Sequence, residues 1–260
     1  MIDVTIGILT WNSKALLKGC LDSISNNKID HTFEVIVVDN HSEDDTREMV
    51  RKNYPEVVLI ENSRNFGVSP ARNQIIRTAR GKYLIFLDVD TVVQPDAVNV
   101  LIKSMDSNPG IAIGGPKLIY EDRSLQLSCR PFPSIMNIVT EGTFLRDAFS
   151  NSRFVKGYTL EDWDHSGTRE VDWMYGACLI IRTENLKTIG EFDERFFYLY
   201  EDIDLCFRAK KLGMRVMYFP QAVVVHFLRR ERKGLFHKMI RSHIKSISLY
   251  LLKDYYGLVR

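Results

Sequence analysis

One short segment constrains the fold of this chain more than any other: a largely apolar run over 82–87 that ends in Asp88-Val89-Asp90. Such a run is typical of a strand buried on both faces of a parallel sheet. Ligands of open α/β sheets bind beyond the carboxyl ends of the strands. Two carboxylates one residue apart repel each other unless a cation lies beside them, and oxygen ligands of this kind suit Mg²⁺ or Mn²⁺. The segment therefore predicts a metal site at the end of a buried strand.

The surrounding sequence alternates between strand and helix patterns. Apolar runs predict strands over 4–9, 33–38, 57–60, 82–88, 176–181, 216–219 and 222–225. Helical spacing predicts helices over 14–24, 42–52, 69–80 and 203–212, with a further one from Pro95. This order predicts an α/β fold with a mostly parallel central sheet, helices on both faces and a helical tail at the C-terminal end.

Charge is unevenly distributed along the 260 residues. Residues 229–260 hold 9 Lys or Arg and 2 Asp or Glu, a net charge of +7, so the remainder carries −5 of the total of +2. An acidic body argues against a general nucleic-acid binder, whereas a basic tail suits an anionic surface.

Three features bear on where the protein acts. No apolar run reaches the roughly 18 residues that span a bilayer, and Met1-Ile2-Asp3-Val4 leads straight into a predicted strand without the basic start of a signal peptide. The four cysteines show no metal-type spacing, so we expect them to be reduced and mostly buried; they are Cys20, Cys129, Cys178 and Cys206. These features predict a cytoplasmic protein.

The turn after the first predicted strand, Thr10-Trp11-Asn12-Ser13, argues against several nucleotide-binding classes. It lacks the Gly-x-Gly-x-x-Gly of dinucleotide-binding oxidoreductases and the Gly-rich, Lys-bearing loop of phosphate-binding ATPases. It also lacks the Gly-rich, Arg-bearing loop expected of a sugar-1-phosphate nucleotidyltransferase. A small polar turn at this point can hold the edge of a base instead.

Two segments in the first half of the chain are candidates for nucleotide contact, each with a structural alternative. Asp39 ends a predicted strand, where it suits a pyrimidine N–H or a ribose hydroxyl, or else caps the next helix. Segment 62–73 offers Asn65 and Arg72 to a nucleotide, or else is a turn followed by a solvated helix face.

Two positions in the second half are candidates for the chemistry. Glu201-Asp202 follows the aromatic run 196–200. These acids either balance a helix dipole or supply a general base whose pKa the apolar walls raise. His226 ends a predicted strand and is either packed in the core or a neutral metal ligand beside Asp90.

Taken in order, these pieces resemble one family. They are Thr10-Trp11-Asn12, Val37-Val38-Asp39-Asn40, Asn65-Phe66-Gly67, Ala71-Arg72-Asn73, Asp88-Val89-Asp90, Gly176-Ala177, Phe192-Asp193-Glu194, Glu201-Asp202-Ile203-Asp204-Leu205 and His226. The ordered set, over about residues 3–228, resembles the family 2 inverting glycosyltransferases with the A-type fold. Segment 173–226 is most similar to the rhamnosyltransferase-like members of that family.

The resemblance implies a nucleotide-sugar site. Its donor-side residues would be Thr10, Asn12, Asp39, Asn65, Gly67, Arg72, Asp88, Val89, Asp90, Gly176 and Ala177. Asp90 and His226 would bind Mg²⁺ or Mn²⁺, and Asp202 would be the catalytic base, with Asp204 as the alternative. Trp173 and Glu201 would lie on the acceptor side. Gln74 and Asn40-His41 depart from the family pattern near the expected nucleotide contacts.

Two segments lie outside this framework. Segment 117–172, rich in Pro, Ser and charge, is predicted to be an acceptor-side insertion within a catalytic domain of residues 1–228. Residues 229–260 are predicted to form a basic amphipathic helical tail with apolar residues at helical spacing: Leu235, Phe236, Met239, Ile240, Ile244, Ile247 and Leu251. Such a tail packs on protein, either the catalytic domain or a second subunit, or lies on an anionic membrane.

The expected reaction is metal-dependent transfer of a sugar, with inversion, from a dTDP- or UDP-sugar to a hydroxyl of a glycan or lipid-linked acceptor. Rhamnose is the first candidate, and cell-surface polysaccharide synthesis at the inner face of the plasma membrane is the expected setting. Two alternatives remain: a non-catalytic nucleotide-sugar-binding module, which would not need Asp202, and a sugar-1-phosphate nucleotidyltransferase.

Overall fold

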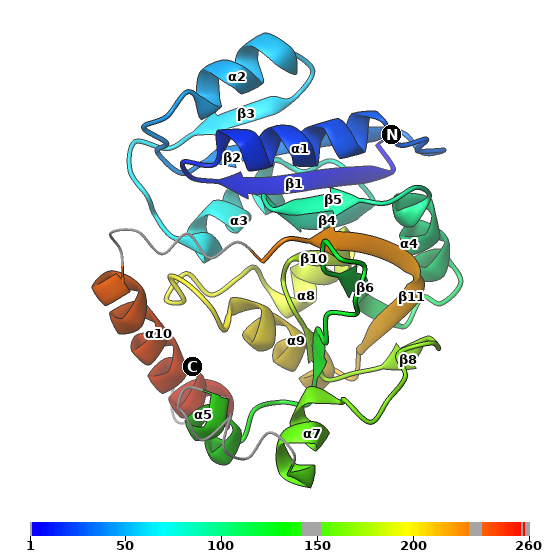
Figure 1. Ribbon diagram of the computed structural model, residues 1–260, viewed down its shortest axis with the longest axis vertical. Helices are drawn as coiled ribbons and strands as arrows, with labels where there is room; N and C mark the ends of the chain where they lie inside the picture. Colours follow the sequence, from blue (N-terminus) through cyan, green and yellow to red (C-terminus); the bar gives the residue numbers. More distant parts are fainter. Residues whose placement is uncertain (1, 142–151, 229–235, 256, 258–260) are drawn as a thin grey trace.

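A central sheet organises the computed structural model, which describes residues 2–141, 152–228, 236–255 and 257 (Figure 1). Its nine strands within these residues follow the order β3-β2-β1-β4-β10-β6-β11-β5, with β8 also paired to β11. They are β1 (Val4–Thr10), β2 (Phe33–Asp39), β3 (Val58–Glu61), β4 (Tyr83–Asp88), β5 (Thr91–Val93), β6 (Ile111–Ile119), β8 (Arg169–Glu170), β10 (Cys178–Arg182) and β11 (Arg215–His226). Strands β7 (Cys129–Arg130) and β9 (Trp173–Met174) form a separate pair.

The sheet is mostly parallel, as the sequence predicts. Strands β3, β2, β1 and β4 run parallel to one another, and β6 runs parallel to β11. Strand β10 is antiparallel to both of its neighbours, β4 and β6. Its N-terminal end therefore lies at the same edge of the sheet as the carboxyl end of β4.

Helices lie on both faces of the sheet (Figure 1). In chain order they are α1 (Lys14–Ser25), α2 (Thr46–Asn53), α3 (Val68–Thr78), α4 (Ala97–Asp106), α5 (Ile135–Glu141), α7 (Arg153–Thr159), the 3₁₀ turn η1 (Thr183–Asn185), α8 (Leu186–Ile189), α9 (Glu201–Lys211), α10 (Phe236–Tyr250) and the π-helical turn η2 (Leu251–Tyr255). The predicted α/β class with helices on both faces is confirmed.

Two apolar cores explain why these elements pack as they do. On one face, Leu17, Leu21 and Ile24 of α1 are buried against alternate residues of β1 and β4. On the other, Ile75 of α3 and Leu205 of α9 are buried against the remaining strand residues. Because successive strand side chains point to opposite faces, a continuous apolar run supplies both cores at once.

Two strand predictions need correction. The sequence patterns did not reveal β6, whose Gly114-Gly115-Pro116 interrupts the apolar run. The two short strands expected at 216–219 and 222–225 form one strand, β11, with a register shift between Phe219 and Val223. This irregularity accommodates Pro220, which has no N–H to give to the ladder.

The described part of the C-terminal tail packs on the domain through one helix face. Ser246 Oγ donates a hydrogen bond to Tyr198 O at 3.0 Å, and Tyr250 Oη donates one to Pro133 O at 3.2 Å. Ile244, expected on the apolar face, is instead exposed. Residues 229–235, and the side chains of 236–240, lie outside the described part.

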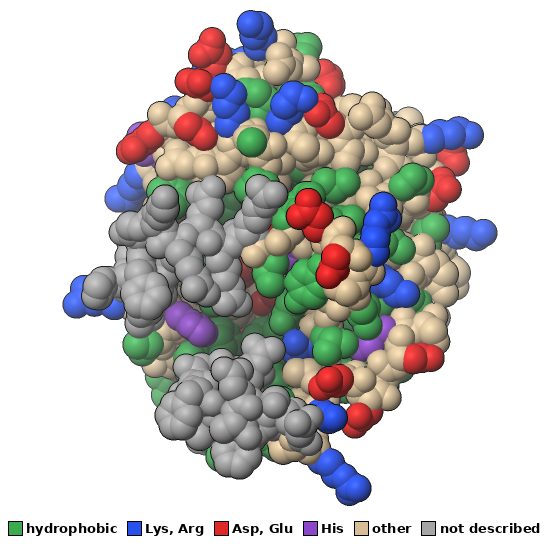
Figure 2. Space-filling view, viewed as in Figure 1, with side chains coloured by type: hydrophobic (Ala, Val, Ile, Leu, Met, Phe, Trp, Pro, Cys, Tyr) green, Lys and Arg blue, Asp and Glu red, His purple; other side chains and the backbone are tan. Residues whose placement is uncertain are grey.

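Charge gathers on part of the surface (Figure 2), and the cysteine side chains lie in the core. Charged side chains gather over α2 at the top of the view, whereas hydrophobic ones appear in the middle of the same face (Figure 2). All four cysteines are free thiols and buried, as expected. Among the described residues, none of the helices combines the length and apolar character needed to traverse a bilayer.

Candidate active site

The carboxyl ends of the strands gather polar residues at one edge of the sheet. Thr10 of β1 is in register with Asp39 of β2, and β4 ends at Asp88 on the other side of β1. Just before β10, Ala177 O accepts a hydrogen bond from the Asp88 N–H at 2.9 Å. This edge is where ligands of open α/β sheets bind.

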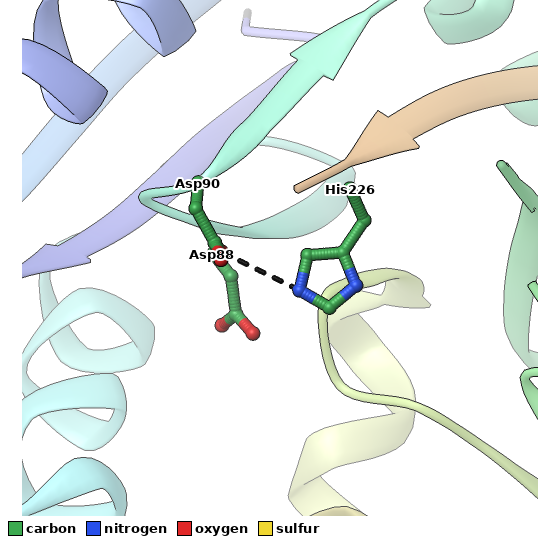
Figure 3. A group of neighbouring side chains, drawn as sticks. All are labelled: Asp88, Asp90 and His226. Carbon is green, nitrogen blue, oxygen red and sulfur yellow. Dashed lines mark ion pairs between the residues drawn. The ribbon is translucent and has the colours of Figure 1, made fainter. Parts of the chain in front are cut away.

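Three predicted residues form a cluster with metal-ligand chemistry. One ligand atom from each of Asp88, Asp90 and His226 lies within 4.8 Å of the others (Figure 3). The Oδ1 of Asp90 is 3.4 Å from Nε2 of His226. Two carboxylates and an imidazole form a donor set suited to Mn²⁺ or Mg²⁺.

The backbone brings these three residues together across 138 positions of sequence. After β4 the chain turns at Val89-Asp90 and returns as β5, whose Thr91 pairs with His226 of β11. Thr91 Oγ1 donates to Asp88 O at 2.7 Å, and the Phe227 N–H donates to Asp90 O at 3.0 Å. The pairing of β5 with β11 therefore sets the position of the cluster.

A residue that sequence reasoning missed, Gln126, contacts His226. Its Oε1 lies 2.7 Å from Nδ1 of His226, and its side chain is buried. Burial lowers the pKa of His226, but Asp90 and Asp88 raise it by more, so the net shift is upward. No motif indicates Gln126, because it lies in the hairpin after β6 within a segment of poor periodicity.

Arg72 of α3 connects the cluster to the predicted base. Its Nη2 donates to Asp88 Oδ1 at 3.0 Å and to Gly176 O at 2.9 Å, and its Nη1 lies 3.4 Å from Glu201 Oε1. The guanidinium also lies over the rings of Phe86 and Phe192, at 5.6 and 5.5 Å from their centroids. This buried cation partly compensates several carboxylates at once.

Glu201 and Asp202 begin α9 and face the same region. The Gly176 N–H donates to Asp202 Oδ2 at 2.9 Å, and the Ile203 N–H donates to its Oδ1 at 2.9 Å. A Cβ at Gly176 would lie 2.9 Å from Arg72 Nη1, so a larger residue there would displace the guanidinium. Glu201 is 6% exposed, and its Oε2 is buried with no hydrogen-bond partner.

The environment of this acidic pair raises the pKa of both carboxyls. Burial raises the pKa of Glu201 to about 7, with a further rise from Asp202 and an opposing effect of Arg72. Burial likewise raises the pKa of Asp202, again opposed by Arg72. Because the two carboxyls interact, they titrate as a pair. A raised carboxyl pKa in a polar cleft is typical of general acid–base groups.

Asp204, the alternative base, forms ion pairs with Arg208 and Lys253. It is 0% exposed, its Oδ2 accepts hydrogen bonds from Arg208 at 2.8 and 2.9 Å, and Lys253 of the tail pairs with its Oδ1. Lys253 also pairs with Asp193 Oδ2 at 2.8 Å. Asp204 therefore anchors the tail and has no free oxygen directed at the sheet edge.

The expected nucleoside end contains two unsatisfied buried oxygens. Asp39 Oδ1 accepts from the Ser42 N–H at 2.9 Å and lies 3.2 Å from Arg47 Nε. Its Oδ2 and the Oγ1 of Thr10 have no partner. Leaving such an atom unpaired costs about 1–3 kcal/mol, so these oxygens are suited to a ligand.

Asn12 lies next to this end in a strained turn. Its backbone is left-handed, with φ of 49°. The Asn12 N–H donates to Ser42 Oγ at 2.9 Å, and its Oδ1 accepts from the Glu43 N–H at 2.7 Å. Asn12 thus ties the loops after β1 and β2 together.

Asn40 and Gln74, which depart from the family pattern, belong to one side-chain network. Asn40 accepts from Asn62 at 3.1 Å, and Asn62 exchanges two hydrogen bonds with Gln74 at 2.9 and 3.0 Å. Asn40 also donates to Asn65 Oδ1 at 3.0 Å. Gly67 follows with φ of 94°, and a Cβ there would lie 2.7 Å from Phe197 O. Asn65 and Gly67 therefore shape the loop before α3.

Trp173, expected on the acceptor side, lies in the core. It is 7% exposed, and its Nε1 donates to Pro131 O at 2.7 Å. Its neighbour Tyr175 is only partly buried and directly precedes Gly176. An acceptor role for Trp173 stays a prediction, as do the roles of the other site residues.

Comparison with known proteins agrees with this geometry. The model of the family "Glycosyl transferase family 2" matches residues 5–159, more than half of the chain. An N-acetylglucosaminyl-diphospho-decaprenol L-rhamnosyltransferase of Mycobacterium tuberculosis is 26% identical over 234 residues, which cover 86% of this chain and 76% of that protein. Rhamnosyltransferase WbbL of Escherichia coli is 26% identical over 180 residues, which cover 68% of this chain and 64% of that protein.

Solved structures share the fold at low identity. GalNAc-T7 in complex with UDP, GalNAc and Mn²⁺ superimposes with a TM-score of 0.69 at 15% identity, over 98% of this chain and 49% of that one. TarS of S. aureus superimposes with a TM-score of 0.62 at 19% identity, over 97% of this chain and 40% of that one. The predicted resemblance is confirmed: the chain belongs to glycosyl transferase family 2, with the α/β fold of these enzymes and similarity to rhamnosyltransferases.

Proposed function

We propose that the protein transfers a sugar, with rhamnose the first candidate, from a nucleoside-diphosphate donor to a hydroxyl of a glycan or lipid-linked acceptor in cell-surface polysaccharide synthesis. One observation carries the proposal: the Asp88, Asp90 and His226 cluster lies at the strand-end edge, and Arg72 connects it to Glu201 and Asp202. The rhamnosyltransferase relatives support the sugar and the kind of acceptor.

A divalent ion fits the cluster, and Asp90 and His226, with Asp88 beside them, would hold it. Two carboxylate groups and one imidazole offer ligand atoms within 4.8 Å of one another. The structural neighbour solved with UDP and Mn²⁺ supports a metal requirement. A bound ion would neutralise charge that develops on the leaving diphosphate.

Other residues at this edge of the sheet would bind and orient the donor. The unpaired Asp39 Oδ2 and Thr10 Oγ1 would bind the nucleoside at the far end of the edge. The loop Gly176-Ala177 would lie beneath the donor sugar. Arg72, fixed between aromatic rings, would orient Asp88 toward the donor.

Asp202 is the proposed base. Its carboxylate would take the proton from an acceptor hydroxyl. The hydroxyl oxygen would bond to the anomeric carbon as the bond to the diphosphate oxygen breaks, which inverts the configuration and releases the nucleoside diphosphate. Two observations support Asp202 over its neighbours: it is more exposed than Glu201, and Asp204 is committed to Arg208 and Lys253.

The domain organisation is part of the same proposal. We place the catalytic domain at residues 1–228, with 117–172 as an acceptor-side insertion and 229–260 as a tail. The tail's inner face packs on the domain, while Arg241, Ile244, Lys245 and Leu252 are exposed on its outer face. We propose that this outer face contacts an anionic membrane surface, because basic and apolar side chains alternate there within residues 229–260, whose net charge is +7.

The donor assay tests the proposed reaction. Nucleotide release and donor binding would be measured with a panel of dTDP- and UDP-sugars, in Mg²⁺, in Mn²⁺ and with a chelator. We expect release from one donor only when metal is present. Binding without release across a panel of acceptors would favour a binding module, and failure to bind every donor would contradict the site assignment.

A further inference from the structure

The contact between Gln126 and His226 has a chemical consequence. Gln126 lies in the hairpin that follows β6, where its N–H donates to Leu118 O at 2.9 Å. Its side chain is 2% exposed, and its Oε1 is 2.7 Å from Nδ1 of His226, which is 5% exposed. A contact this short between two buried groups is a hydrogen bond.

The amide oxygen determines which ring nitrogen carries the proton. An amide oxygen only accepts hydrogen bonds, so Nδ1 of His226 must donate. In the neutral ring, Nε2 then has a free lone pair. That atom is the one 3.4 Å from Asp90 Oδ1, inside the group that also contains Asp88.

The opposite amide orientation would have the opposite effect. With the amide N–H₂ against Nδ1, the ring proton would move to Nε2 and occupy the position facing Asp90. In the observed orientation Gln126 Nε2 is buried with no partner, and the short contact of Oε1 to His226 is the one that the structure retains. The contact to Asp90 at 3.4 Å lies beyond the usual N–H···O range of about 2.7–3.2 Å, whereas that to Gln126 lies within it, so the geometry favours the proton on Nδ1.

We propose that Gln126 is a positioning residue that holds His226 in the Nδ1-protonated tautomer and thereby makes Nε2 the metal-binding atom. The second half of this inference rests on the proposed function, in which the cluster binds a divalent ion. Metal-binding histidines generally donate their other ring N–H to such an outer partner, and losing the partner typically costs about 10–100-fold in metal affinity.

Nitrogen NMR of the metal-free protein, residues 1–260, tests the tautomer directly. Long-range ¹H–¹⁵N spectra of histidine-labelled protein, recorded where the rings are neutral, distinguish Nδ1–H from Nε2–H. The His226 signal is assigned by its loss in His226→Gln. We expect the Nδ1–H pattern in the wild type, the same pattern in Gln126→Glu, and a change toward Nε2–H in Gln126→Met.

Mn²⁺ titration followed by electron paramagnetic resonance tests the consequence. Gln126→Met should lower the affinity about 10–100-fold, while Gln126→Glu, which keeps the acceptor, should restore most of it. Gln221→Met is the matched control, since Gln221 is an exposed residue of the same strand as His226. Its affinity should equal that of the wild type.

The outcomes separate this inference from the proposed function. A wild-type His226 that is protonated on Nε2 when neutral overturns the inference without any variant, so a misfolded Gln126→Met does not block the test. An unchanged Mn²⁺ affinity in folded Gln126→Met also overturns it. If His226 shows Nδ1–H but Asp90→Ala leaves Mn²⁺ binding intact, the metal assignment of the proposed function fails, and with it the role of Nε2.

Discussion

Arg72 joins the two functional halves of the site at the scale of single residues. It contacts Asp88 on one side and Glu201 on the other, and it is only 4% exposed. A buried guanidinium requires charged partners, because removing one partner of a buried ion pair strongly destabilises the folded protein. The donor side and the base are therefore electrostatically coupled through one guanidinium.

Replacing Asp202 by Asn should remove most turnover while donor binding survives. The amide oxygen can still accept from the Gly176 N–H, whereas the amide nitrogen cannot accept from the Ile203 N–H, and the proton acceptor is lost. General base catalysis is typically worth ~10²–10⁴-fold, and we expect a fall in kcat of that size. Calorimetric donor binding and steady-state kinetics would check it, and a near wild-type rate would exclude Asp202 as the base.

Replacing Glu201 by Gln should stabilise the protein at alkaline pH. Burial and Asp202 raise the pKa of Glu201 from 4.5 to about 7 in the folded state. The folded protein therefore binds more protons than the unfolded chain between these values, and wild-type stability falls as pH rises through that window. Above pH 7 the variant lacks this penalty, which is of order ~1–3 kcal/mol because one pKa unit is about 1.4 kcal/mol.

Urea unfolding of the wild type and Glu201→Gln at pH 4.5 and pH 8 would test this expectation. The free energies of unfolding should be similar at the lower pH and diverge at the higher one. Glu48→Gln on the exposed surface of α2 is a control that should follow the wild type at both. Parallel pH dependence of all three proteins would show that Glu201 carries no such penalty.

At the scale of elements, α10 and η2 are fastened beside the loop that leads into the base. Ser246 bonds to Tyr198, the ring of Tyr250 lies 5.4 Å from that of Tyr200, and Lys253 pairs with Asp193 and Asp204. These contacts surround the segment directly before Glu201 and Asp202. Removing the whole tail would therefore disturb the base as well as any surface function, so point variants on the outer face give a cleaner test.

The double variant Arg241→Glu/Lys245→Glu should lose binding to anionic vesicles without losing structure. Both side chains are exposed on α10, and each basic residue near an anionic surface contributes about 1 kcal/mol. Flotation with vesicles containing phosphatidylserine measures binding, and Lys103→Glu/Lys187→Glu provides a control with the same charge change at exposed positions elsewhere. Equal flotation of all forms would contradict the membrane role. If the wild type is a dimer and the α10 variant is a monomer, the outer face of α10 binds a second copy of the chain instead.

At the scale of the whole molecule, the sequence predicted the elements whose information is local. The apolar runs identified β1, β2 and β4, because burial on both faces requires a continuous apolar strand, and the helical spacing identified α1. The sequence did not predict β6, because Gly114-Gly115-Pro116 interrupts its apolar run. The position of β6 in the sheet depends on its pairing with β10 and β11.

What the sequence alone determined about this protein is its class: an α/β sheet with carboxylates at its strand ends, in the motif order of a glycosyltransferase. Only the tertiary structure decided which distant groups meet. Gln126 reaches His226 across 100 positions, and Arg72 reaches Glu201 across 129. Periodicity encodes which face of an element is buried, but such contacts depend on strand register and loop path, which no local pattern specifies.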